Sequence, residues 1–246
     1  MREPAEILAA VEAALGSAAA GPWDGLRVVV TAGGTREAID PVRFIGNRSS
    51  GRMGLALAAA ARRRGAAVKL VAANVSLPSP PGVETIAVES AAELAAATSD
   101  AFADADVLLM AAAVADFRPA ESAEDKIVRE GSGGLDLHLE ATEDVLATLS
   151  ARRRPEQTLV GFAAEHGGEF AERARRKLER KGLDAIVVND VSDRSIGFDS
   201  AENEVTLITA DAAESIPRGS KDAVAEAILE RVATLRSGAR SPVDGG

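Results

Sequence analysis

Short runs of β-branched and other apolar residues recur along the chain, and they constrain its fold more than any other feature. They lie at Leu26–Thr31, Val68–Ala72, Thr85–Val88, Val107–Ala112, Thr158–Phe162, Ala185–Asn189 and Val205–Thr209. Apolar runs of this length are typical of strands that are buried on both faces. Helical segments separate most of them, at Gly51–Arg64, Ala91–Ala103, Glu143–Arg153, Glu169–Lys181 and Lys221–Leu235. This alternation predicts an α/β fold with a doubly wound, mostly parallel, Rossmann-like sheet and helices on both of its faces.

Three regions fall outside the alternation. Residues 1–25 combine an amphipathic helix at Pro4–Leu15 with a linker, and residues 237–246 are expected to form a disordered tail. Phe117–Leu137 is long, polar and glycine-containing, which predicts a flap or a protruding arm. Residues 26–236 are therefore expected to form one domain.

The composition argues against several classes of protein. The chain has 28 basic and 38 acidic residues, a formal net charge of -10, whereas general nucleic-acid binders are usually basic. No apolar run approaches the ~20 residues of a membrane span, and the first residues do not resemble a signal peptide. Cysteine is absent, and His138 and His166 lie far apart, which disfavours a zinc site. We therefore expect a cytoplasmic protein with neither nucleic acid nor membrane as a partner.

The segment between the first strand and the first helix carries the clearest functional signal. It contains Gly33-Gly34 and later Gly46 to Gly51, close to the predicted helix N-terminus. Glycine allows close approach of a phosphate, and the N–H groups of a helix N-terminus bind anions. The spacing matches neither the dinucleotide fingerprint nor the P-loop, in which Arg52-Met53 would have to be Lys-Ser/Thr. Glycines that only serve turns are the alternative, but the polar and basic residues gathered here favour anion binding: Arg36, Arg43, Asn47, Arg48, Ser49, Ser50 and Arg52.

The same stretch, Thr31–Gly54, resembles the synthetase part of bacterial phosphopantothenoylcysteine decarboxylase/synthetase proteins. The resemblance continues in order through Ala111–Phe117, Lys126-Ile127, Val160–Glu165, Lys177–Lys181, Asn189–Val191 and Ile196–Phe198. It implies a phosphopantothenate–cysteine ligase of coenzyme A synthesis, which joins 4′-phosphopantothenate to L-cysteine and converts CTP to CMP and pyrophosphate. The carboxylate is activated as an acyl-cytidylate, which the cysteine amine then opens. Both steps depend on positioning and charge neutralisation, so a chain without cysteine is compatible with them.

The resemblance also implies roles for individual residues. The residues expected to be catalytic are Asn47, Lys177 and Arg43. Those expected to bind the substrate are Arg43, Asn47, Ala112 and Asp116. The nucleotide is expected to contact Gly33, Ser49, Ser50, Gly51, Gly161, Phe162, Ala163, Lys177, Ile196, Gly197, Phe198 and Lys221. Mg²⁺ is expected to arrive with the triphosphate, with Asp190 and Asp199 as secondary candidates for its ligands, and no flavin is expected in this chain.

Basic residues crowd the helix predicted at Glu169–Lys181. Arg173, Lys177 and Lys181 fall on one stripe, where like charges cost roughly 0.2–0.5 kcal/mol per pair unless an anion lies between them. A solvated basic face is the simpler explanation, but the resemblance assigns Lys177 to the triphosphate. Lys221 begins the last helix, where a positive charge opposes the helix dipole. That position favours a role in contacting a phosphate.

Some positions depart from the family pattern. The flap motif has Val128-Arg129 where relatives have a pair of lysines, and Ala225 replaces a further lysine. The segment Ala141–Asp144 replaces a common Lys-Asn-Pro-Asp. The flap contacts and the outer phosphate contacts therefore stay open.

The resemblance also suggests how the chain is assembled. Bacterial relatives carry an upstream flavin-dependent decarboxylase domain, so we expect this chain to be a separately encoded or excised synthetase half. A homodimer is expected, with Phe117–Leu137 as the arm that exchanges between subunits. The alternatives are an NAD(P)-dependent Rossmann oxidoreductase, disfavoured because the chain has no tyrosine, and a non-catalytic nucleotide-binding module. The choice between CTP and ATP is open on physical grounds.

Overall fold

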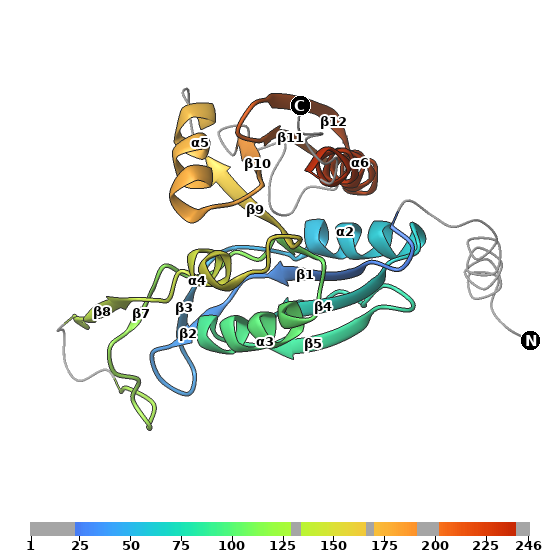
Figure 1. Cartoon of the computed structure of the whole chain (residues 1–246). Coiled ribbons are helices and arrows are strands. Elements are labelled where there is room, and N and C mark those ends of the chain that lie inside the picture. Colours follow the sequence, from blue (N-terminus) through green and yellow to red (C-terminus); the bar gives the residue numbers. More distant parts are fainter. Residues whose placement is uncertain (1–22, 129–133, 166–169, 191–201, 240–246) are drawn as a thin grey trace, which may run out of the picture.

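The computed structural model describes residues 23–128, 134–165, 170–190 and 202–239 (Figure 1). Its centre is an eight-stranded sheet with the order β12-β11-β10-β9-β6-β1-β4-β5. The strands from β10 to β5 in this order are parallel to one another. Strand β11 is antiparallel to β10, and β12 is antiparallel to β11. The predicted mostly parallel, doubly wound sheet is confirmed. Its strands are β1 (Arg27–Gly33), β4 (Ala67–Ala73), β5 (Glu84–Val88), β6 (Val107–Met110), β9 (Thr158–Glu165), β10 (Ala185–Asp190), β11 (Glu202–Ile208) and β12 (Ala213–Ser220).

The order of the strands reverses next to β1. From β1 the chain proceeds outward through β4 and β5, then returns to the other side of β1 and continues through β6, β9 and β10. The helices that follow β1 and β6 therefore leave the sheet on opposite faces and open a crevice between the carboxyl ends of these strands. In α/β sheets of this kind, such a switch point is where ligands bind.

Helices cover both faces of the sheet, as predicted. Alternate residues of β1 face opposite layers: Val28 and Val30 pack with α2 and α6, whereas Val29 packs with α3, α4 and α5. This alternation follows from the two-residue period of a strand. The helices are α2 (Arg52–Arg63), α3 (Ala91–Ala103), α4 (Val145–Arg152), α5 (Phe170–Lys181) and α6 (Lys221–Ala239).

Two small antiparallel hairpins lie beside each other at one end of the molecule (Figure 1). One joins β2 (Arg36–Ala38) to β3 (Phe44–Gly46), and the other joins β7 (Phe117–Pro119) to β8 (Leu139–Ala141). We call these hairpins and the described residues between β7 and β8 the arm. In the described part of the chain, every large apolar side chain that is exposed belongs to the arm: Val42, Phe44, Phe117, Val128, Leu135, Leu137 and Leu139.

The structure differs from the sequence prediction at the C-terminal end. Strand β12 was not predicted, because its residues are mostly polar and include Pro217, which an edge strand tolerates. Helix α6 extends to Ala239, so residues 237–239 are helical rather than part of a tail. The predicted helix at Pro4–Leu15 and residues 240–246 lie outside the described residues. Among the residues described, no helix has the length and apolar character needed to cross a membrane.

Candidate functional site

A cleft of about 810 Å³ opens at the switch point, between the N-terminus of α2 and the carboxyl ends of β6, β9 and β10. Helix α5, the start of α4, strand β11 and the first residue of α6 also line it. Although the whole chain is acidic, the charged residues of this lining are mainly basic. The basic residues are Arg48, Arg52, Lys177, Arg180, Lys181 and Lys221, and the acidic residues are Asp116, Glu143 and Asp144. The cleft therefore concentrates positive charge where an anionic ligand can reach it.

The N-terminus of α2 forms one part of the cleft. Gly51 caps the helix with φ +77°, and a Cβ atom there would lie 2.7 Å from Val75 Cγ2. Only glycine fits both constraints. Ser49, Ser50 and Gly51 line the cleft, and the first turn of α2 contains no acidic side chain. The backbone N–H groups of this turn are therefore suited to an anion.

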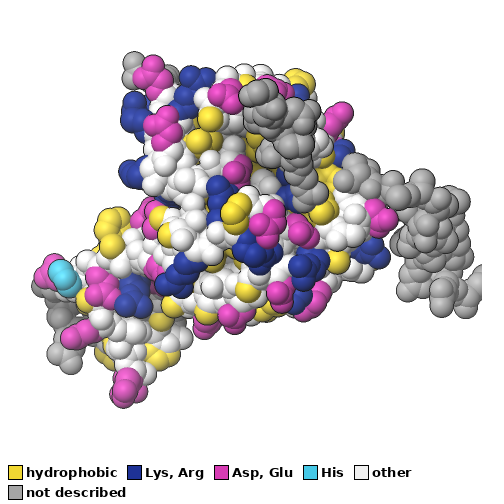
Figure 2. Space-filling view, viewed as in Figure 1, with side chains coloured by type: hydrophobic (Ala, Val, Ile, Leu, Met, Phe, Trp, Pro, Cys, Tyr) yellow, Lys and Arg dark blue, Asp and Glu magenta, His cyan; other side chains and the backbone are white. Residues whose placement is uncertain are grey.

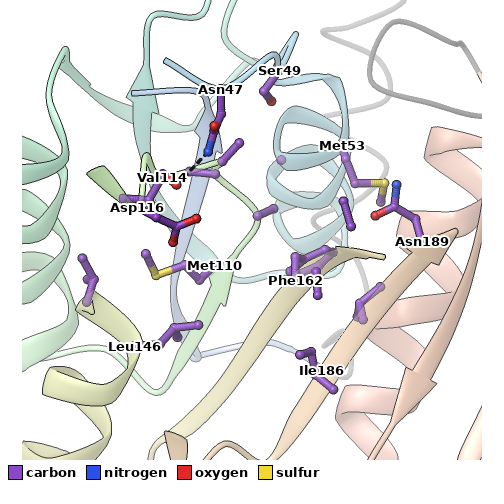
Figure 3. Close-up of a pocket in the computed structure, with 18 of the residues that line it drawn as sticks. Asn47, Ser49, Met53, Met110, Val114, Asp116, Leu146, Phe162, Ile186 and Asn189 are labelled. Atoms are coloured by element: carbon purple, nitrogen blue, oxygen red, sulfur yellow. Dashed lines mark hydrogen bonds between the residues drawn. The ribbon is translucent and has the colours of Figure 1, made fainter. Parts of the chain in front are cut away.

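Asn47 lies across the cleft from α5 and is fixed by a hydrogen bond. Its Nδ2 donates to the carbonyl oxygen of Val114 at 2.8 Å (Figure 3). Val114 belongs to a segment that follows β6, residues 111–116, which we call the 111–116 turn. The carboxylate of Asp116, at the end of this turn, is exposed and also lines the cleft. The structure thus brings Asn47, Ala112 and Asp116 to one wall.

Threonine hydroxyls hold the backbone of the 111–116 turn. Thr31 Oγ1 accepts from the N–H of Ala112 at 3.0 Å, and Thr35 Oγ1 accepts from the N–H of Ala115 at 2.9 Å. Both threonines are 0% exposed. From the other side, Thr142 Oγ1 donates to the carbonyl oxygen of Ala115 at 2.6 Å. The bond of Thr35 is buried and the other two are partly buried, and together they fix the backbone of the turn.

The opposite wall is charged, and the basic residues of the α5 stripe are each paired with a carboxylate. Lys177 Nζ donates to Glu165 at 2.5 Å, and Arg173 Nε donates to the other oxygen of the same carboxylate at 3.0 Å. Lys181 Nζ donates to Asp144 at 3.0 Å. The expected repulsion along the stripe of α5 is therefore relieved by carboxylates of the protein itself. Figure 2 shows the basic side chains that gather over this helix.

Glu165 ends β9 and is 9% exposed. Burial alone would raise the pKa of its carboxyl group. The hydrogen bonds and positive charges of Lys177 and Arg173 outweigh that effect and hold the pKa of Glu165 below its ordinary value. The carboxylate is therefore ionised at neutral pH and acts as a fixed negative charge beside the cleft.

Lys221 lies at the N-terminus of α6 and is 7% exposed, with its side chain lining the cleft. The preceding Ser220 accepts from the N–H of Ala223 at 3.2 Å and so caps the helix. Phe162 and Ala163, on β9, also line the cleft, and Figure 3 shows Phe162 there. These placements agree with the expected nucleotide region, and the individual roles stay predictions.

Several predicted site residues are placed elsewhere. Gly33 packs against β4, where a Cβ atom would lie 1.9 Å from the Ala73 carbonyl oxygen, and Gly161 packs under Leu183. Neither is among the residues that line the cleft. Ile196, Gly197, Phe198 and Asp199 lie outside the described residues, as does the side chain of Asp190.

Arg43 is also not brought to the cleft. Its Nη1 donates to Asp40 at 2.7 Å and to the carbonyl oxygen of Ile127 at 3.0 Å. Asp40 additionally accepts from the N–H of Ile127 at 3.1 Å. Burial would raise the pKa of Asp40, but three backbone hydrogen bonds and the Arg43 charge hold that pKa below its ordinary value. In this chain, Arg43 therefore connects the β2–β3 hairpin to the rest of the arm.

Sequence reasoning did not assign several residues that build the site. Thr35 and Glu165 stand inside recognised motifs, which was a signal that they matter but not of what they contact. Thr142 lies where the sequence departs from the family pattern, so no signal marked it. The cleft also contains Met53, Met110, Arg180 and Asn203.

The described residues alone do not form a metal site. In the ranges that the structure describes, no group of three or more acidic or histidine residues is close enough to bind a metal ion. Of the carboxylates that line the cleft, Asp144 already accepts from Lys181 and from the N–H of Ala147 at the start of α4. Mg²⁺ commonly binds through substrate phosphates and water together with one or two carboxylates, and exposed Asp116 could supply one.

Comparisons with known proteins point to one family. The model of the family described as "DNA/pantothenate metabolism flavoprotein C-terminal domain" matches residues 23–235. The chain is 46% identical to the Coenzyme A biosynthesis bifunctional protein CoaBC of Mycobacterium tuberculosis (strain ATCC 25618 / H37Rv), over 89% of this chain and 55% of that protein. It is 42% identical to the protein of the same name of Bacillus subtilis (strain 168), over 98% of this chain and 60% of that protein.

A solved structure supports the same relationship. The crystal structure of the C-terminal domain of a Coenzyme A biosynthesis bifunctional protein CoaBC is 36% identical, with a TM-score of 0.75, and the match covers 89% of this chain and 99% of that chain. The chain thus matches nearly all of that domain, whereas it spans 55% and 60% of the length of the two curated relatives.

Proposed function

The chain belongs to the family of DNA/pantothenate metabolism flavoprotein C-terminal domains, and we propose that it is a phosphopantothenate–cysteine ligase of coenzyme A biosynthesis. One observation carries the proposal. A single cleft at the switch point has Asn47 and the 111–116 turn on one wall, and Lys177 and Lys221 with the N-terminus of α2 around the rest. A rigid wall whose backbone is held by uncharged groups suits an acyl group, and a basic wall suits a nucleotide triphosphate.

The reaction joins 4′-phosphopantothenate to L-cysteine in two steps. A carboxylate oxygen of the substrate attacks the α-phosphorus of CTP, the bond to pyrophosphate breaks, and an acyl-cytidylate forms. The amine of cysteine then attacks the acyl carbon, loses a proton, and expels CMP. The choice of CTP over ATP rests on the resemblance described above.

The residues of the cleft position these groups and neutralise their charge. The first-turn N–H groups of α2, together with Lys177 and Lys221, hold the triphosphate. Mg²⁺ would supply further neutralisation when bound with the nucleotide, and the exposed carboxylate of Asp116 could be one of its ligands. An asparagine amide has two N–H donors. One of those of Asn47 is fixed on Val114, and we assign the other to the reacting carboxyl group.

The arm supports a homodimer as part of the proposal. Its exposed apolar side chains, including Val42, Phe44 and Phe117, are concentrated on two small hairpins, and the described part of the chain leaves them uncovered. A second copy of the chain would cover them by the same surface, as in a two-fold dimer. Light scattering should give the mass of a dimer, and Phe44→Ser with Phe117→Ser should give a monomer.

The test of the proposed function is pyrophosphate release by the dimer in the presence of Mg²⁺. Release should require both 4′-phosphopantothenate and a nucleotide triphosphate, and phosphopantothenoylcysteine should form only when L-cysteine is added. CTP should be preferred over ATP. A folded dimer that releases no pyrophosphate with either nucleotide would refute the ligase and leave a nucleotide-binding module as the better explanation.

A further inference from the structure

Glu165 is a buried carboxylate that the reaction as described does not use. It pairs with Lys177 and Arg173, and it follows directly after Ala164, which lines the cleft. Lys177 itself lines the cleft and is considerably more exposed than Glu165, at 40% against 10% of their side chains. The ammonium group therefore lies between a fixed carboxylate of the protein and the space in which a phosphate would bind.

The two cationic partners of Glu165 differ in whether they can turn from Glu165 to a phosphate in the cleft. Lysine is a compact charge on a flexible stem, so Lys177 can turn from one anion to another. Arg173 is not among the residues that line the cleft, and its guanidinium contacts the second oxygen of Glu165. When Lys177 turns to a phosphate, Arg173 still compensates the buried carboxylate, which would otherwise be strongly unfavourable.

We propose that Glu165 is the counter-ion that Lys177 leaves when a polyphosphate binds and to which it returns when pyrophosphate departs. Glu165 is then a positioning residue: it acts through Lys177 and lowers the affinity of the cleft for pyrophosphate, so that the product can leave. The identity of the polyphosphate rests on the proposed function, whereas the exchange itself requires only that an anion binds beside Lys177.

In the ion pair of this wall that does not involve Glu165, the carboxylate is more exposed. Lys181 pairs with Asp144, whose side chain is 45% exposed and also caps α4. Exposed pairs are weak and screened by salt. Glu165 is shielded from water, so it competes with an incoming phosphate much more effectively than Asp144 does.

The experiment is a calorimetric titration with inorganic pyrophosphate and with tripolyphosphate, using the full chain. We expect Glu165→Gln to bind pyrophosphate about tenfold more tightly than the wild type, since the competing charge is removed while the side-chain shape is kept. Lys177→Gln should bind it more weakly. In the Lys177→Gln background, the additional Glu165→Gln change should have an effect of about twofold or less, because the exchange partner is gone.

A matched control is Glu172→Gln, which removes a carboxylate from α5, the helix that carries Lys177. Glu172 is exposed, pairs with Arg176 at 3.8 Å, and does not line the cleft, so its removal should leave pyrophosphate affinity unchanged. Glu165→Asp keeps the charge but shortens the side chain. It should tighten binding less than Glu165→Gln does, and it keeps the inference testable if Glu165→Gln folds poorly.

The outcomes separate this inference from the proposed function. Weaker or unchanged pyrophosphate binding by folded Glu165→Gln overturns the exchange, as does equal tightening in the Lys177→Gln background. A mere loss of structure would weaken binding, which is the opposite of the expected result. If the wild type binds pyrophosphate and the variants behave as expected but no cysteine-dependent turnover occurs, the ligase proposal fails and the exchange stands.

Discussion

The two walls of the cleft are held by different forces. The wall that carries Asn47 and the 111–116 turn is held by hydrogen bonds from Thr31, Thr35 and Thr142. The α5 wall carries ion pairs, of which Arg173 with Glu165 is the most buried and Lys177 with Glu165 is the one that lines the cleft. The bonds that hold the first wall join uncharged groups, and we call it the neutral wall. The ion pairs of the second wall join charged side chains, and we call it the charged wall.

The difference shows which wall can change when a ligand binds. Breaking the buried hydrogen bond between Thr35 and Ala115 leaves a donor unsatisfied, which costs about 1–3 kcal/mol. An ion pair on the charged wall can instead exchange its carboxylate for a phosphate with little loss. We therefore expect the neutral wall to fix the geometry of the reacting group, and the charged wall to adapt to the nucleotide and to pyrophosphate. The predictions below test this division, from the largest expected effect to the smallest.

The largest effect is expected from Asn47→Asp on the neutral wall. A carboxylate cannot donate to the carbonyl oxygen of Val114, and its charge would repel the substrate carboxylate. Loss of one positioned donor of this kind typically lowers kcat about 100-fold or more. Steady-state measurement of pyrophosphate release checks the prediction, with nucleotide binding as the control for folding. A fall of less than tenfold would show that Asn47 is not central to the chemistry.

The next effect is expected from Thr35→Val, which removes a buried hydroxyl and keeps the shape of the side chain. The N–H of Ala115 would lose its acceptor, so the free energy of unfolding should fall by about 2 kcal/mol. The 111–116 turn should also loosen, which should raise KM for 4′-phosphopantothenate more than KM for the nucleotide. Urea denaturation and steady-state kinetics measure the two effects.

Thr35→Ser is the matched control, because it keeps the hydroxyl group. It should recover most of the stability and the substrate KM. If Thr35→Val raises both KM values equally, the hydroxyl does not act through the turn, and the proposed division between the walls would be wrong at this position.

On the charged wall, Lys177→Gln should raise KM for the nucleotide about tenfold, which corresponds to about 1.4 kcal/mol. Its effect should shrink at high salt, since screening weakens the contribution of a half-exposed charge. Arg176→Gln on the same helix is the control, since Arg176 is exposed and does not line the cleft. A loss of activity that is the same at all salt concentrations would argue against an electrostatic role for Lys177.

The sequence allowed the neutral and charged walls to be predicted to different extents. Asn47 and the residues that begin α2 were identified because they are close in sequence to the strand and helix that place them. Lys177 was assigned through the resemblance, yet its partner Glu165 was not. The contact between them depends on how α5 packs on the end of β9, which no local pattern encodes.

The supporting hydrogen bonds were the hardest features to predict. Thr35 and Ala115 lie 80 positions apart, and their contact exists only because β1 and β6 are neighbours in the sheet. The alternation of strands and helices predicted that sheet correctly. It did not predict the register between strands. The resemblance assigned Arg43 to the substrate, which stays a prediction, and the structure shows Arg43 bonded to Asp40 and to Ile127 of the arm. Roles that depend on side-chain contacts between distant segments therefore required the structure.

The smallest effect distinguishes the walls by their response to pH. The pKa of Glu165 is lowered from an ordinary value of 4.5, so its ionised form stabilises the fold above that pH. This contribution is lost as the pH falls below 4.5 through the pKa of the folded state.

Glu165→Gln should therefore be less stable than the wild type at neutral pH, by about 1 kcal/mol or less because Lys177 is partly exposed, and the difference should shrink in acid. Glu226, whose pKa is also lowered, titrates in both proteins and cancels from the difference. The deficit of Thr35→Val should instead stay constant over the same range, because no titrating group is removed. Urea denaturation at several pH values measures both differences, and a deficit of Glu165→Gln that does not change with pH would show that the charged wall is held by packing rather than by ion pairs.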